Sequence, residues 1–130
     1  MHWAALVPEL VVSDLNRSLE TYALFGFSVA YRREDFAYLA SGGAQMMLQQ
    51  GPVAEAWSTL PLDYPFGRGI NFQIEVADLE AAGYPLRREA RSEWYRADDI
   101  EHGQRECLLL DPDGYLLRFC QPLGERPAGE

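Results

Sequence analysis

The chain has 130 residues, of which 48% are hydrophobic, so it can form one folded domain with a core of its own. Its 20 acidic residues outnumber the 11 basic ones and give a formal net charge of −9, which argues against a nucleic acid or an anionic membrane as partner. No apolar run reaches the length of a membrane span and the first residues do not read as a signal peptide, so we expect a cytoplasmic protein.

The first part of the chain predicts a strand, a helix and three more strands. Residues 6–12 form an apolar, β-branched run. Ser13 or Asp14 can cap a helix whose apolar residues recur at helical spacing until Gly26. Three further strands are expected at 27–31, 36–40 and 44–50. Residues 4–50 therefore constitute a first βαβββ module.

A long connection, residues 51–68, follows this module and contains three prolines and three aromatic residues, Trp57, Tyr64 and Phe66. Loops of this length inside small domains often cover a functional site. The alternative is a linker whose aromatic side chains patch the surface, and the sequence leaves both readings open.

The pattern then restarts in a second module, residues 69–121. A strand is expected at 70–76, and Val76-Ala77-Asp78-Leu79 repeats the pattern of Val12-Ser13-Asp14-Leu15. Only a few residues separate Leu79 from Gly83, so the second helix should be a short turn. Asp111-Pro112-Asp113-Gly114 has strong turn chemistry and predicts a hairpin between residues 106–110 and 115–121. Residues 122–130 are rich in Gly, Pro and Glu and predict a flexible tail.

Alternation along the strands gives each module one apolar face and one mixed face. On the mixed faces fall the three side chains at 45, 47 and 49, those at 71, 73 and 75, and Arg118. Such a face can be solvated, or it can line a small-molecule pocket. The candidate ligand-binding residues are Tyr38, Gln45, Met47, Gln49, Trp57, Tyr64, Phe66, Asn71, Gln73, Glu75, Trp94, Tyr95, His102 and Arg118.

Several motifs carry a family resemblance that covers nearly all of the chain. They are Ser18-Leu19 through Tyr22, Gly26-Phe27, and Asp111-Pro112-Asp113-Gly114 followed by Leu116-Leu117-Arg118 and Gln121. With its paired modules the chain resembles the vicinal oxygen chelate superfamily of glyoxalase I, extradiol dioxygenases and bleomycin resistance proteins, and is most similar to the last. The resemblance implies an α+β fold in which two βαβββ modules form curved, mostly antiparallel sheets around a cleft. The short second helix departs from that pattern.

The resemblance also implies where a metal would bind. Enzymes of the superfamily place His or Glu at four positions that map here to Val7, Gln49, Asn71 and Arg118. None of these is a good ligand for a divalent cation, and Arg118 would repel one. We therefore expect no cofactor and a metal-independent, drug-binding homodimer like the bleomycin resistance proteins, sometimes with swapped units.

The ligand class follows from the candidate residues. Aromatic side chains and the acidic net charge favour a planar or cationic compound. Arg118 favours a carboxylate or phenolate instead, unless Glu75 or Glu9 pairs with it.

Other functions stay open. The main alternative is a metal-dependent glyoxalase- or dioxygenase-type lyase or oxidoreductase with other ligands, and a third is a module that binds another protein. His102 and Glu106 could act as acid and base and Cys107 as nucleophile, although no spacing marks them as a group. Cys107 and Cys120 are expected to be buried thiols rather than a disulfide.

Overall fold

The computed structural model describes residues 2–51, 58–59 and 61–129. The first module forms a four-stranded sheet of order β1-β4-β3-β2, in which only β1 and β4 run parallel. Its elements are β1 (Glu9–Val12), α1 (Leu15–Leu24), β2 (Ser28–Arg33), β3 (Phe36–Ser41) and β4 (Ala44–Gln50).

The second module repeats this topology with the order β5-β8-β7-β6, and again only the β5–β8 pair is parallel. Its elements are β5 (Asn71–Glu75), the 3₁₀ turn η2 (Ala81–Gly83), β6 (Arg88–Ala97), β7 (Ile100–Leu110) and β8 (Leu116–Pro127). The predicted α+β architecture of two repeated units is confirmed.

Helix α1 begins and ends where its sequence signals lie. The Asp14 carboxylate accepts a hydrogen bond from the backbone N–H of Arg17, and Gly26 follows the helix with a positive φ of 95°. The first strand is shorter than expected, because pairing with β4 starts at Glu9.

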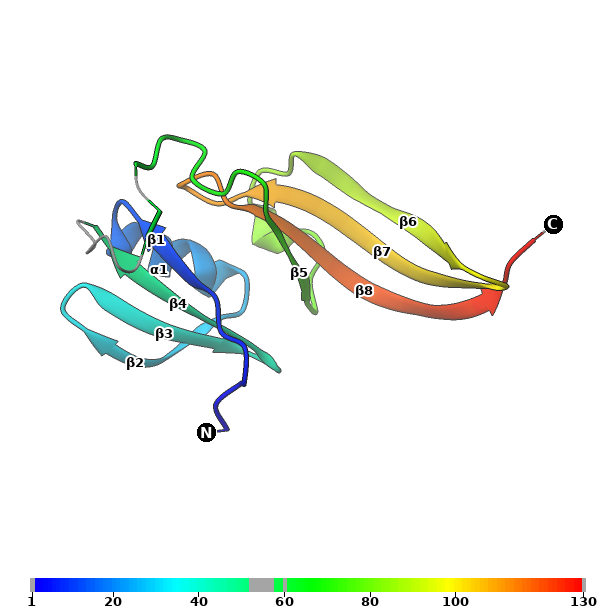
Figure 1. Cartoon of the computed structure of the whole chain (residues 1–130), viewed down its shortest axis with the longest axis horizontal. Coiled ribbons are helices and arrows are strands. Elements are labelled where there is room, and N and C mark those ends of the chain that lie inside the picture. Colours follow the sequence, from blue (N-terminus) through cyan, green and yellow to red (C-terminus); the bar gives the residue numbers. More distant parts are fainter. Residues whose placement is uncertain (1, 52–57, 60, 130) are drawn as a thin grey trace.

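The expectation of a flexible tail from residue 122 is wrong for most of that segment. β8 continues to Pro127 and pairs with the start of β7, from Ile100↔Pro127 to Gly103↔Gly124. Strands β6, β7 and β8 thus extend as a three-stranded arm well past the short β5 (Figure 1). Pro122 lies at a bulge and Pro127 at the strand end, two positions where a missing N–H is tolerated.

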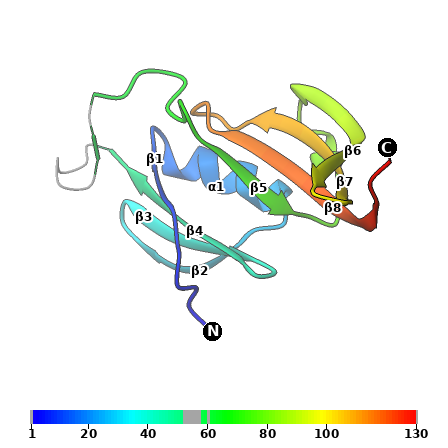
Figure 2. The ribbon, with the colours of Figure 1, turned by 45° about the vertical axis from the view of Figure 1, so that its right-hand side comes forward.

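Both sheets bury their apolar faces in one core, and α1 lies between them (Figure 2). Phe25, at the end of α1, packs edge-on against Phe119 of β8 and Tyr84 after η2, with ring centroids 4.9 and 5.1 Å apart. The Cys107 thiol points into this core, toward the carbonyl of Leu79. The end of α1 thus adds apolar cover to the second module, whose own helix is only the short turn η2.

The Asp111–Gly114 turn ties the modules together. The buried Asp111 carboxylate accepts a hydrogen bond of 2.8 Å from the Tyr22 hydroxyl of α1 and also binds the backbone N–H groups of Asp113 and Tyr115. Asp113 accepts hydrogen bonds from the hydroxyl and the backbone N–H of Ser13, just before α1. The predicted hairpin turn is therefore also an inter-module link.

The predicted alternation of side chains is confirmed. In β4 Met46 and Leu48 are buried in the core, and in β5 Ile74 is buried while Gln73 is exposed. Each sheet therefore has a face turned away from the shared core. We call these the first open face (Tyr31, Phe36, Tyr38, Gln45, Met47 and Gln49) and the second open face (Asn71, Gln73, Glu75, Gln104, Glu106 and Arg118).

Candidate functional site

The first open face carries an aromatic cluster. Tyr31 and Tyr38 lie opposite each other on β2 and β3 with their rings stacked, 5.4 Å between centroids and 20° between planes. Trp3 packs edge-on against both, and Phe36 lies 5.8 Å from Tyr31. Trp3 and Tyr31 keep 53% and 42% of their surface exposed, so the cluster offers ring surface to a ligand.

Hydrogen bonds hold this cluster in place. The Tyr38 hydroxyl donates to the Gln45 side-chain oxygen over 2.6 Å, and that oxygen also accepts from the backbone N–H of Ala4. The Gln45 amide nitrogen donates to the carbonyl of His2, so both ends of the carboxamide fix the N-terminal segment that carries Trp3. Met47 lies opposite Tyr38 in the register of β3 and β4.

The second open face is polar, and its hydrogen bonds centre on Glu106, which is only 2% exposed. One carboxylate oxygen accepts from the Tyr95 hydroxyl at 2.6 Å and from Arg88 Nη2 at 3.3 Å. The other accepts a short hydrogen bond from the Gln104 amide nitrogen. The Arg118 Nε atom lies 3.9 Å from this second oxygen.

Arg118 is anchored mainly through Gln73. Arg118 Nη2 donates to the Gln73 side-chain oxygen over 2.8 Å, and the Gln104 amide nitrogen donates to the same oxygen. The Nε atoms of Arg118 and Arg88 are both buried without a hydrogen-bond partner. A cavity of about 250 Å³ lies against this network, lined by Gln73, Tyr95, His102, Gly103, Gln104 and Arg118.

The network fixes the ionisation of its acidic groups. Burial alone would raise the pKa of Glu106, but the hydrogen bonds from Tyr95, Gln104 and Arg88 and the charge of Arg118 outweigh it and lower that pKa below its ordinary value. Burial, the hydrogen bond to Glu106 and the charge of that carboxylate raise the pKa of Tyr95. At neutral pH the site holds a carboxylate and a protonated phenol.

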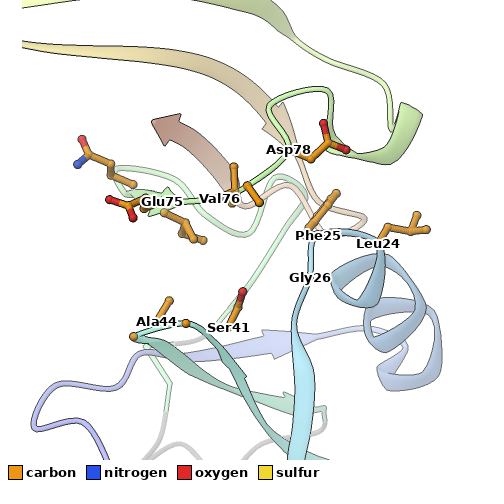
Figure 3. Close-up of a pocket in the computed structure, with 13 residues that line it drawn as sticks. Leu24, Phe25, Gly26, Ser41, Ala44, Glu75, Val76 and Asp78 are labelled. Carbon is orange, nitrogen blue, oxygen red and sulfur yellow. The ribbon is translucent and has the colours of Figure 1, made fainter. Parts of the chain in front are cut away.

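Two further cavities lie between the modules. The larger, about 760 Å³, is bounded by the end of α1, the β3–β4 turn and the residues at and after the end of β5, and Figure 3 shows Phe25, Ser41, Glu75 and Asp78 around it. A smaller one of about 290 Å³ is lined in part by Gln45, Asn71 and Gln73. This smaller cavity brings together predicted site residues of both modules.

Some predicted pocket aromatics lie elsewhere. Phe66 packs against Tyr115, and Tyr64 and Pro65 lie on Gly114, so these loop residues cover the Asp111–Gly114 turn. Trp94 lies against Gly103 and under the guanidinium of Arg126, on the side of the arm opposite Tyr95, because neighbouring strand residues point to opposite faces. Trp57 lies outside the described residues.

Apart from Gln45, Asn71 and Gln73 at the smaller cavity, the other predicted residues form no common site in the described part of one chain. Gln49 donates through its amide nitrogen to the carbonyls of Asp35 and Gln50. Glu75 borders the cavity of about 760 Å³, and His102 pairs with Glu125 across 3.4 Å. The two open faces look away from the core that they share, so the described part of one chain does not close one over the other.

Trp3, Tyr31 and Phe36 of the aromatic cluster are absent from the ligand-binding residues predicted from the sequence, and Glu106 was predicted only as a possible acid or base. Strand alternation could have found Phe36 beside Tyr38, since Ala37 and Leu39 point to the core. No local signal could have found Trp3, because its place depends on Gln45 more than forty residues later.

The residues present do not fit the divalent metal of the enzymes. Of the four mapped positions Val7 offers no donor atom, the Gln49 amide nitrogen is bound to backbone carbonyls, and the Arg118 guanidinium carries a positive charge. Among residues 2–51, 58–59 and 61–129, no group of three or more His, Cys, Asp or Glu side chains could hold a metal ion. The candidate catalytic residues also separate, since Cys107 points into the core and Glu106 to the open face.

Neither a family model nor a curated protein matches the chain. Solved structures do match it. A bleomycin-binding protein complexed with bleomycin is 19% identical, with 92% of this chain and 98% of that chain covered and a TM-score of 0.58. A bleomycin resistance determinant encoded on the transposon Tn5 is 20% identical, with 93% and 99% covered and a TM-score of 0.59.

A third similar structure is a glyoxalase/bleomycin resistance protein/dioxygenase from Alicyclobacillus acidocaldarius. It is 20% identical, with 95% of this chain and 96% of that chain covered and a TM-score of 0.55. The chain therefore has the fold of the vicinal oxygen chelate superfamily, as the sequence motifs suggested. No helix among the described residues is long and apolar enough to cross a membrane.

Proposed function

We propose that the protein binds a small molecule, such as a drug, without a metal ion and holds it in a cleft between two copies of the chain. The observation that carries this proposal is the aromatic cluster of the first open face, with Trp3 and Tyr31 half exposed. Rings of this kind offer large, rigid contact area to a planar compound and attract a cation to their faces.

The cluster is preorganised for such a ligand. Tyr38 is hydrogen-bonded to Gln45, and Gln45 also holds the segment of Trp3. A ligand that stacks on these rings therefore loses little side-chain entropy in ordering them. The bleomycin-binding protein and the Tn5 resistance determinant support drug binding as a use of this fold.

A second copy would supply what one chain lacks. Both open faces look away from the shared core, so a ligand on either face needs another molecule to enclose it. Strands β1 and β5 are sheet edges, and the nearby Leu6 and Ile70 expose 86% and 49% of their surface. Free edges flanked by exposed apolar residues are suited to a two-fold interface. The two free thiols, Cys107 and Cys120, support a cytoplasmic location.

Calorimetric titration of the purified protein with bleomycin-class compounds and planar cationic dyes tests the proposal. Tyr31→Ala should weaken binding by about 1–3 kcal/mol, the range typical of one lost stacking contact. Val29→Ala removes a half-exposed residue of the same strand outside the aromatic cluster and should leave binding unchanged. Loss of binding after metal chelation, or equal effects of the two substitutions, would contradict the proposal.

A further inference from the structure

The second open face as a whole has no surplus of positive charge, because Glu75 also lies on it, but the network around Glu106 does. Within its hydrogen-bonded network one carboxylate, Glu106, faces two guanidinium groups, Arg88 and Arg118, at 3.3 and 3.9 Å. Glu75 and Glu9, considered from sequence as partners of Arg118, are both exposed, and the ion pair of Arg118 is with Glu106 instead. Gln73 and Gln104 are neutral, so the network carries one net positive charge.

The acidic member of this network is closed to a ligand, because Glu106 is 2% exposed and its carboxylate already accepts three hydrogen bonds. One oxygen of Glu106 accepts from Tyr95 and Arg88, and the other accepts from Gln104. A cationic ligand group would have to displace one of these donors.

The basic member has donors to spare. A guanidinium has five N–H groups, and Arg118 uses one nitrogen, Nη2, to bind Gln73. Its Nε is buried and faces the Glu106 carboxylate across 3.9 Å, so the N–H groups left for a ligand are those of Nη1 and the second one of Nη2. Arg118 also lines the cavity of about 250 Å³, where the Tyr95 hydroxyl and the Gln104 amide lie beside it.

We propose that this cavity binds a carboxylate of the ligand through Arg118. A carboxylate matches the planar fork of a guanidinium and can accept two parallel hydrogen bonds from it. The inference rests on the proposed function and deepens it, since it assigns the ligand an acidic group on the second open face next to a planar part on the first.

A matched pair of probes tests this inference with the full chain. 2-Naphthoate and 2-naphthamide share one planar ring system, and only the first carries a charge. We expect naphthoate to bind at least about tenfold more tightly than the amide, as a charge-assisted bidentate pair allows. Arg118→Gln should abolish this preference while the amide binds as before, and Arg118→Lys should retain part of it.

Arg126→Gln is the matched control, because Arg126 lies over Trp94 on the other side of the arm. It should leave the tenfold preference intact, and thermal melting will confirm that each variant is folded. Equal binding of both probes to the wild type, or a preference that persists in Arg118→Gln, would overturn the inference. If the amide binds and Tyr31→Ala weakens it, the proposed function stands without the carboxylate site. If neither probe nor any planar dye binds, both fail.

Discussion

The two open faces have the same strand topology and opposite chemistry. The first exposes the rings of Trp3 and Tyr31, which pack on the buried Tyr38, whereas the second holds a buried carboxylate between Arg88 and Arg118. On the second face Glu106 binds Arg88 of another strand, and Arg118 binds Gln73 of another strand. The two modules therefore share their strand topology, while the side chains on their open faces differ in chemistry.

The modules also differ on the side of the core. The first has the ten-residue helix α1, and the second has only the three-residue turn η2. Phe25 and Tyr22 reach from α1 to the second module, one by packing and one by a hydrogen bond to Asp111. One helix thus serves two sheets, which makes α1 the element on which the second module depends.

The largest expected effect is a loss of stability when the contact between α1 and the second module is removed. Phe25→Ala removes a 94%-buried ring between Phe119 and Tyr84, since Phe25 is 6% exposed. Unfolding by urea should give a free energy of unfolding lower by about 3–5 kcal/mol. Leu24→Ala, at the neighbouring residue that is 53% exposed, should change it by less than about 1 kcal/mol. Similar losses in both variants would show that α1 does not bridge the modules.

The next effect concerns the ion pairs of Glu106 on the second open face. Glu106→Gln leaves Arg88 and Arg118 without their carboxylate, and we expect a loss of about 2–3 kcal/mol, because these arginines are partly solvated. Glu93→Gln disrupts an exposed pair with Arg91 on the same strand and should cost under about 1 kcal/mol. Chemical denaturation of both variants gives the comparison, and a loss for Glu106→Gln no larger than that of Glu93→Gln would contradict it.

A smaller effect concerns the link at the Asp111–Gly114 turn. Tyr22→Phe keeps the buried ring and removes the hydroxyl that donates to Asp111, so stability should fall by about 1–2 kcal/mol. Tyr64→Phe alters a hydroxyl on a 60% exposed residue and serves as the control. Thermal unfolding measures both, and an unchanged Tyr22→Phe protein would remove this hydrogen bond from the account.

The smallest effect is the pH dependence of stability, which contrasts two of the buried carboxyl groups, Glu106 and Asp111. The pKa of Glu106 is lowered on folding, so its contribution to stability is present above its ordinary pKa and is lost as the pH falls through and below it. Burial raises the pKa of Asp111, so the folded state binds this proton at a higher pH than the unfolded state does. The folded state therefore gains stability relative to the unfolded state as the pH falls toward the ordinary pKa of this carboxyl. Between pH 7 and 3, the stability gap between wild type and Glu106→Gln should narrow, and the gap to Asp111→Asn should widen. Parallel curves for all three proteins would contradict these assignments.

The helices, strands and turns could largely be predicted from local sequence signals. The caps at Asp14 and Gly26, the turn at Asp111–Gly114 and the alternation in β4 and β5 each act within a few residues, so the sequence carries them directly. The Glu106 network joins side chains from four strands, so it depends on register, and a β-bulge between Gly103 and Gln104 shifts that register. The pairing of residues 122–127 with β7 also depends on register. It was not predicted, because the Gly and Pro content of residues 122–127 suggested a loose tail.

Mixing two damaged proteins tests most directly whether the two open faces of different copies build one cleft. The Trp3→Ala/Tyr31→Ala variant lacks the first face and Arg118→Gln lacks the second, and each alone should have lost tight binding of 2-naphthoate. After the two are unfolded together and refolded as a mixture, random pairing yields about half mixed dimers, each with one intact cleft, so about a quarter of the wild-type binding sites should return. A mixture that binds no more 2-naphthoate than its two components measured separately would contradict the shared cleft.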